Sequence, residues 1–64
     1  MWEIYEKGND TPIHQEIDED SLWDLFGLTK DQHISIGDMW INEIIEIKIW
    51  YGRKFQIYTF IRIA

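Results

Sequence analysis

Isoleucine at alternate positions dominates the last third of this 64-residue chain. The two alternating runs are Ile45, Ile47, Ile49 and then Ile57, Ile61, Ile63. A period of two is typical of a β-strand with one buried face. Residues 51–54, Tyr-Gly-Arg-Lys, separate the runs and contain a turn-forming glycine. The sequence therefore predicts that the chain ends in a β-hairpin.

The register of this hairpin depends on its loop, because a slip of one residue exchanges the two faces of a strand. A three-residue loop over 52–54 would bring the isoleucines of both strands to one face. The opposite face would then mix charged and aromatic residues: Glu46, Lys48, Trp50, Gln56, Tyr58, Phe60 and Arg62. We expect that face either to pack partly under a helix or to meet a partner.

A first hairpin is predicted at the start of the chain. Residues 2–7 and 13–17 alternate weakly and flank the turn cluster Gly-Asn-Asp-Thr-Pro at 8–12. Glycine tolerates a positive φ and proline restricts its own φ, so such a cluster favours a reversal of the chain. Residues 2–17 are therefore expected to form two antiparallel strands.

One short helix is predicted after this hairpin. Asp20 or Ser21 can cap it, the apolar residues of segment 22–26 share a face at helical spacing, and Gly27 is placed to end it. A helix of barely two turns is unstable alone, so we expect it to dock on the sheet.

The segment between this helix and the terminal hairpin is predicted to be mostly extended. Residues 29–32 carry a capping pattern that favours one further turn, residues 34–36 alternate, and residues 39–41 read as the start of a strand. The expected fold is a single α+β domain over residues 1–64. It has a small curved antiparallel sheet of four to five strands, open or closed into a small barrel, with one short helix and a C-terminal β-hairpin.

The composition restricts where such a chain can work. A chain of this length buries only roughly 60% of the surface that its unfolded form exposes, and there is no cysteine to form a disulfide. Aromatic residues make up 16% of the chain, so they serve either the core or an interface, and a homodimer is one way to cover a surplus.

No apolar run is long enough to span a membrane, and no signal peptide is apparent. We expect a cytoplasmic protein, in the host cytoplasm if a phage encodes it.

Charge is distributed very unevenly along the chain. All twelve acids lie in residues 1–46 with only two lysines, which leaves −10, and residues 47–64 hold four cations and no acid, which leaves +4; the sum is −6. Such a separation can steer the encounter with a charged partner. The alternative is that the acids are paired internally and serve solubility.

Two segments of the chain resemble the YodL-like domain, a small domain of proteins from phages and conjugative elements. Asp-Ser-Leu-Trp-Asp-Leu-Phe-Gly at 20–27 is similar to its acidic helix, through Leu22, Leu25 and Phe26. His-Ile-Ser-Ile-Gly-Asp at 33–38 is similar to its turn, through Ser35, Ile36, Gly37 and Asp38. The resemblance covers residues 20–60, and the His-Pro and Tyr-x-Gly elements of the family are replaced here by residues 29–33. It implies an origin in a mobile element and no particular mechanism.

No motif predicts catalysis, a metal site or a cofactor. His14 and His33 are the only histidines and have no cysteine partner. The acids from Asp18 onward do not fit a calcium loop, since Trp23 stands where its glycine is required. The four glycines are scattered and cannot cradle a phosphate. We therefore predict a protein that is not an enzyme.

The leading hypothesis is a small acidic binding protein that inhibits or modulates a host protein. It would be encoded by a phage or mobile element, act in anti-defence or host takeover, and could imitate the phosphates of a nucleic acid. The candidate partner-binding residues are Glu16, Asp18, Glu19, Asp20, Asp24, Trp23, Trp40 and Trp50. Tryptophan is included because it is enriched at interface hot spots.

The alternative hypothesis is binding of a nucleotide or single-stranded nucleic acid through the terminal hairpin. Aromatic rings stack on bases, and nearby cations hold phosphates. The candidate residues are Lys48, Arg53, Lys54, Tyr58 and Arg62. The net charge of −6 disfavours direct binding of nucleic acid.

Overall fold

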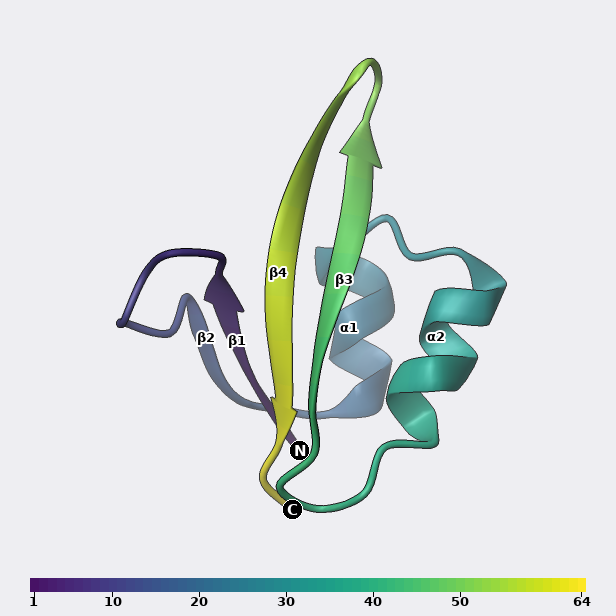
Figure 1. The fold of residues 1–64 in the computed structure, drawn as a ribbon. Helices are drawn as coiled ribbons and strands as arrows, with labels where there is room; N and C mark the ends of the chain where they lie inside the picture. Colours follow the sequence, from purple (N-terminus) through teal and green to yellow (C-terminus); the bar gives the residue numbers. More distant parts are fainter.

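The computed structural model describes residues 1–64 as a four-stranded antiparallel sheet with two helices on one of its faces (Figure 1). The elements are β1 (Trp2–Glu6), β2 (His14–Ile17), α1 (Glu19–Leu25), α2 (Lys30–Gly37), β3 (Ile44–Tyr51) and β4 (Lys54–Arg62). The strand order is β2-β1-β4-β3, so the two hairpins meet where β1 pairs with β4. This pairing also places the two chain ends side by side.

The predicted α+β class, the first hairpin and the terminal hairpin are confirmed. The sheet has four strands and is open, with β2 and β3 at its edges, so the structure does not support a fifth strand or a barrel. Residues 39–41, expected to start a strand, belong to the connection between α2 and β3. In β2 a bulge at Glu16, which has a φ of 52°, shifts the register against β1.

The core consists of hydrophobic residues and lies between the helices and one face of the sheet. Its eleven buried residues are Trp2, Ile4, Leu22, Phe26, Leu28, Ile36, Met39, Ile47, Ile49, Tyr58 and Phe60. The ring of Phe26, the C-cap of α1, packs edge-on against Tyr58 and Phe60, with centroids 5.0 and 5.6 Å apart. Aromatic residues thus supply much of the burial that a small domain without disulfides needs.

The prediction of a single helix was wrong, because residues 30–37 form α2 where a turn and an extended stretch were expected. Thr29 Oγ1 accepts a hydrogen bond from the Gln32 backbone N–H at 3.2 Å, and Gln32 Oε1 accepts one from the Thr29 N–H at 3.0 Å. This capping box starts a full helix that buries Ile36 and leaves Ile34 half exposed. The segment similar to the YodL-like turn is therefore the last turn of a helix, with Asp38 as its C-cap.

The boundaries of α1 also differ from the prediction. Asp18, rather than Asp20 or Ser21, is the N-cap, and its Oδ1 accepts a hydrogen bond from the Ser21 N–H at 2.9 Å. Hydrogen bonding from Ser21, first from its side chain and second from its backbone N–H, lowers the pKa of Asp18, because it stabilises the ionised carboxylate. The helix ends at Phe26 in an extended conformation, so Gly27 does not provide a left-handed cap.

The predicted register of the terminal hairpin was wrong by one residue. Tyr51 pairs with Lys54, which leaves a two-residue loop, Gly52-Arg53, rather than three residues. Gly52 has a φ of +67° and Arg53 does not have a positive φ, the combination of a type II′ turn. This turn places Tyr58 and Phe60 beside the isoleucines of β3 in the core. Phe55, Ile57 and Ile61 consequently lie on the opposite face.

Candidate functional site

No element covers the second face of the sheet, which we call the outer face. Alternation and register place there Ile44, Glu46, Lys48 and Trp50 of β3, Phe55, Ile57, Thr59 and Ile61 of β4, and Glu3 and Tyr5 of β1. Ile44 is 61%, Trp50 58% and Phe55 48% exposed. Trp50 lies opposite Phe55, with ring centroids 5.1 Å apart, and Ile44 lies opposite Ile61. The outer face is therefore an exposed surface rich in apolar side chains.

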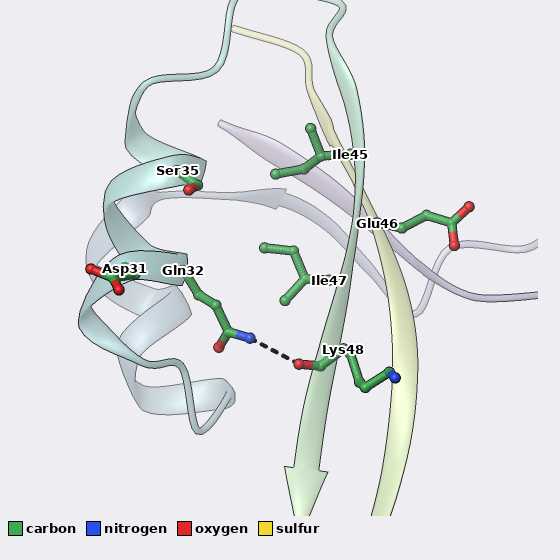
Figure 2. Close-up of a pocket in the computed structure, with 7 residues that line it drawn as sticks. All are labelled: Asp31, Gln32, Ser35, Ile45, Glu46, Ile47 and Lys48. Atoms are coloured by element: carbon green, nitrogen blue, oxygen red, sulfur yellow. Dashed lines mark hydrogen bonds between the residues drawn. The ribbon is translucent and has the colours of Figure 1, made fainter.

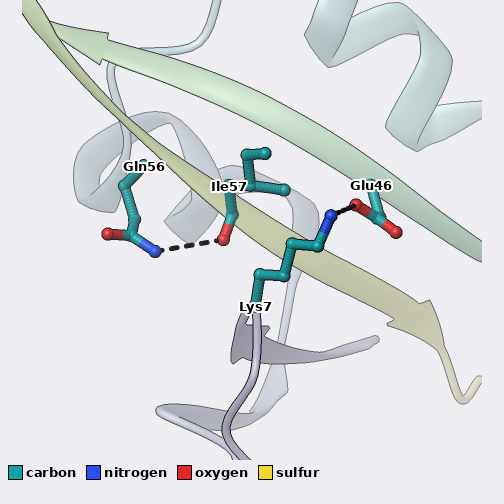
Figure 3. Close-up of polar contacts among 4 residues, drawn as sticks. All are labelled: Lys7, Glu46, Gln56 and Ile57. Atoms are coloured by element: carbon teal, nitrogen blue, oxygen red, sulfur yellow. Dashed lines mark hydrogen bonds and ion pairs between the residues drawn. The ribbon is translucent and has the colours of Figure 1, made fainter.

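Two cations cross this apolar surface. Lys7 Nζ reaches past β4 to Glu46 Oε2 at 3.4 Å (Figure 3). Lys48 Nζ lies 4.4 Å from the centroid of the Phe55 ring and 5.8 Å from that of Trp50, within the range of cation–π attraction. These lysines screen parts of the face with their aliphatic stems and leave its rings accessible.

A hollow of about 270 Å³ opens on the outer face beneath the turn between β1 and β2. Its lining residues are Tyr5, Glu6, Gly8, Asn9, Asp10, Ile44, Thr59 and Ile61. The hollow deepens the apolar surface at the end of the sheet away from the hairpin loop.

The predicted acidic residues form what we call the acidic segment, Glu16 to Asp24, and all five carboxylates are exposed. None lies within 4.0 Å of a lysine or arginine, and Glu19 Oε1 is 3.8 Å from His33 Nε2. Asp18, Glu19 and Asp20 sit at the start of α1, where negative charge stabilises the helix dipole. The acids are thus not neutralised internally, although three of them also serve the helix.

The three predicted tryptophan anchors are exposed but do not share one surface. Trp23 of α1 adjoins the acidic segment and stacks on His33, with centroids 3.9 Å apart. Trp40 is 81% exposed in the connection before β3, whereas Trp50 lies near the other end of that strand. Ile44 begins β3 directly after this connection, and the strand extends roughly 20 Å from Ile44 to Trp50. Only Trp23 accompanies the acids.

The five residues of the nucleic-acid hypothesis are not brought together either. Tyr58 is buried, its hydroxyl lies 3.1 Å from that of Tyr51, and burial raises its pKa to about 12. Arg62 donates to the Met39 carbonyl at 2.6 Å and covers the Trp2 ring at the opposite end of β4. Lys48, with Arg53 and Lys54 of the hairpin end, remains as a cationic group beside aromatic rings.

A groove of about 400 Å³ separates α2 from β3, and sequence reasoning missed it (Figure 2). Its lining residues are Asp31, Gln32, Ser35, Ile45, Glu46, Ile47 and Lys48. Ile45 and Ile47 point toward α2, whereas Glu46 and Lys48 point away from it. The groove exists because residues 30–37 are helical. The Thr-x-x-Gln cap at 29–32 was the one sequence signal that could have indicated it.

The polar side chains discussed as chemical candidates have structural contacts. His14 packs edge-on against Phe26, and His33 stacks on Trp23. No group of three or more His, Cys, Asp and Glu residues is arranged to hold a metal ion. Neither α1 nor α2 has the length and apolar character that crossing a bilayer requires.

The chain was compared with protein-family models, curated proteins and solved structures, and none of the three comparisons finds a match. The resemblance to the YodL-like domain therefore stays a prediction.

Proposed function

We propose that this chain is a non-enzymatic binding protein that docks on another protein through the outer face of its sheet. The observation that supports this most strongly is the exposure of Ile44, Trp50 and Phe55 on a face that no helix covers. Contiguous apolar surface is rarely left bare on a monomeric protein unless it binds something. Exposed tryptophan and phenylalanine are also the side chains that contribute most when an interface forms.

The acidic segment, which includes the first turn of α1 on the other side of the sheet, supplies charge complementarity over a longer range. Its five carboxylates have no lysine or arginine partner, so they are free to attract a cationic surface. A basic groove that binds nucleic acid presents such a surface, and carboxylates can then replace phosphates. The proposal takes both the outer face and the acidic segment into account in one form. In that form, a phage or mobile-element product inhibits or modulates a host protein that binds nucleic acid.

Affinity capture with matched variants tests this function. The tagged protein and the double variant Trp50→Ser, Phe55→Ser are incubated with lysate, and bound proteins are quantified by mass spectrometry. Trp40→Ser is the control, because Trp40 is 81% exposed and belongs to the connection before β3 rather than to a strand of the sheet. A partner retained by the control and lost by the double variant supports the proposal. Equal capture by all three proteins contradicts it.

The charge component has a separate test once such a partner is in hand. Glu16→Gln, Asp20→Asn and Asp24→Asn combined remove three charges and spare the N-cap Asp18. Association at low salt should slow by about tenfold, because steering depends on the summed charge. An association rate independent of both the substitutions and the salt would exclude charge mimicry while leaving docking on the outer face intact.

A second candidate function is binding of single-stranded nucleic acid at the hairpin end. The position of Lys48 over Phe55 and Trp50, on the strand that leads into the loop residue Arg53, favours it. Lys48→Ala and Arg53→Ala should weaken binding of an oligonucleotide in a mobility-shift assay, and binding should fall steeply with salt. Tyr58 is unsuited to this test because it is buried.

A further inference from the structure

The outer edge of β3 has backbone groups without a partner strand. Hydrogen-bonded pairs alternate along an antiparallel ladder, and Tyr51 with Lys54 closes the two-residue loop. The odd-numbered residues of β3 therefore form their backbone hydrogen bonds with β4. The same pattern extends to residue 43, because the Arg62 N–H donates to the Glu43 carbonyl at 3.1 Å. The N–H and C=O groups of residues 44, 46, 48 and 50 consequently face away from the sheet.

The side chain of Gln32 occupies one position on this edge. Its Nε2 donates to the Lys48 carbonyl at 2.8 Å, which is the bond that the N–H of an added strand would make (Figure 2). The other edge-facing groups of Glu46, Lys48 and Trp50 receive no such bond from the protein. An exposed edge of this length is a template for pairing with another chain.

The groove beside this edge has the form that an added strand requires. Asp31, Gln32 and Ser35 form its wall on α2, and Ile45 and Ile47 form its apolar floor. A fifth strand next to β3 would point alternate side chains into the groove, over this floor. Main-chain hydrogen bonds then give affinity, and the groove selects the side chains.

We propose that the groove between α2 and β3 binds an extended segment of a partner protein as a fifth strand, with lysine or arginine at the position facing Asp31. Asp31 is exposed and has no cationic partner within 4.0 Å. The aliphatic stem of a basic side chain fits the isoleucine floor while its charge reaches the carboxylate. The Gln32 amide leaves the Lys48 carbonyl when the segment binds.

A separate segment fits this edge better than a second copy of the chain. Two β3 edges joined about a twofold axis would place both α2 helices on the same side, with strands about 4.8 Å apart. Packed helix axes need about 8–10 Å. Since Gln32 reaches the edge carbonyl, α2 stands level with the edge, and a second helix would crowd it. This site goes beyond the proposed docking on the outer face, because its contacts are backbone groups of the edge.

Titration of the labelled protein with a synthetic peptide, followed by amide NMR, tests the proposal. The probe is a blocked heptapeptide of alternating lysine and valine. The control peptide has the same charge and N-methyl groups on its three central amides, so it cannot pair as a strand. We expect saturable shifts and new exchange protection at the amides of Glu46, Lys48 and Trp50, with shifts of the Gln32 side-chain amide. The methylated peptide should bind at least tenfold more weakly.

Matched variants locate the charge that the peptide recognises. Asp31→Asn should weaken binding by about two- to fivefold, whereas Asp24→Asn, which removes the same charge from α1, should have little effect. Equal binding of the methylated peptide, or shifts confined to residues 16–24, would overturn the proposal in favour of attraction to the acidic segment alone. Protection of the edge amides without peptide, together with a dimer in sedimentation, would overturn it in favour of a second copy.

Discussion

Gly52 determines which side chains of the terminal hairpin are buried. Its φ of +67° is accessible to glycine and strained for other residues, and nothing lies within 4 Å of the position where a Cβ would be. Gly52→Ala should therefore destabilise the protein by about 1 kcal/mol through backbone strain alone. The free energy of unfolding in urea measures this. Gly27→Ala is the control, because Gly27 has open space but no positive φ; equal losses in both variants would contradict the strain argument.

Tyr58 connects the core to pH through its partly buried hydroxyl, which lies 3.1 Å from that of Tyr51. Burial raises its pKa from 10.0 to about 12, so the unfolded chain ionises first as the pH rises. The contribution of Tyr58 to stability, fully present below pH 10, should consequently be lost between about pH 10 and 12, by at most about 1.4 kcal/mol per pH unit. Urea unfolding at several pH values measures this loss.

Tyr58→Phe removes the titrating group and keeps the ring. It should be slightly less stable at neutral pH, since the contact with the Tyr51 hydroxyl is lost. Between pH 10 and 12 its stability should fall less than that of the natural protein. A decline as steep as that of the natural protein would assign the pH dependence to another group.

Among the elements, α2 depends on both ends of the Gln32 side chain. The Oε1 completes the capping box with Thr29, and the Nε2 bonds to the Lys48 carbonyl on β3. Gln32→Glu keeps an oxygen for the cap and loses the donor, whereas Gln32→Ala loses both. We expect losses of about 0.5–1 kcal/mol for the first variant and about 1–2 kcal/mol for the second. Urea unfolding followed by circular dichroism measures both. Unchanged stability in Gln32→Glu would mean that the bond to β3 contributes nothing, and equal losses in the two variants would mean that the cap oxygen contributes nothing.

The elements that sequence could predict are those whose patterns are local. Both hairpins follow from alternation around turn residues, and α1 follows from apolar spacing after an acidic cap. The helix α2 was missed because Ile34 and Ile36 alternate like strand residues, and the side of the helix that faces the core is decided by docking, which buries Ile36 alone. The loop length was missed because Gly-Arg-Lys after Tyr51 fits two or three residues equally well by composition.

The candidate sites likewise differ in whether local sequence patterns or tertiary packing determines them. The exposure of the acidic segment and of Trp50 could be predicted, since charged residues and strand faces have simple rules. The residues of the outer face could not be predicted correctly. A shift of one residue in the hairpin register places Phe55, Ile57 and Ile61 on that face instead of Tyr58 and Phe60. The groove beside β3 could not be predicted at all, as it arises between two elements that only tertiary packing places together.

At the scale of the whole molecule, the net charge and the apolar outer face have opposite effects on self-association. The charge of −6 at pH 7 keeps copies of the chain apart, whereas exposed Ile44, Trp50 and Phe55 favour association. The repulsion disappears near the isoelectric point of about 4.6. Sedimentation should therefore detect self-association near pH 4.6 that is absent at pH 7.

The double variant Trp50→Ser, Phe55→Ser separates the two contributions, because it changes the apolar surface and leaves every charge in place. It should stay monomeric at pH 4.6, whereas Trp40→Ser, which changes the connection before β3 and no strand residue, should associate like the natural protein. Association of both variants would mean that charge neutralisation alone drives it and that the outer face is not adhesive. That outcome would also remove the main support for docking through this face, since association that persists without the Trp50 and Phe55 rings leaves those rings with little apolar attraction to offer a partner.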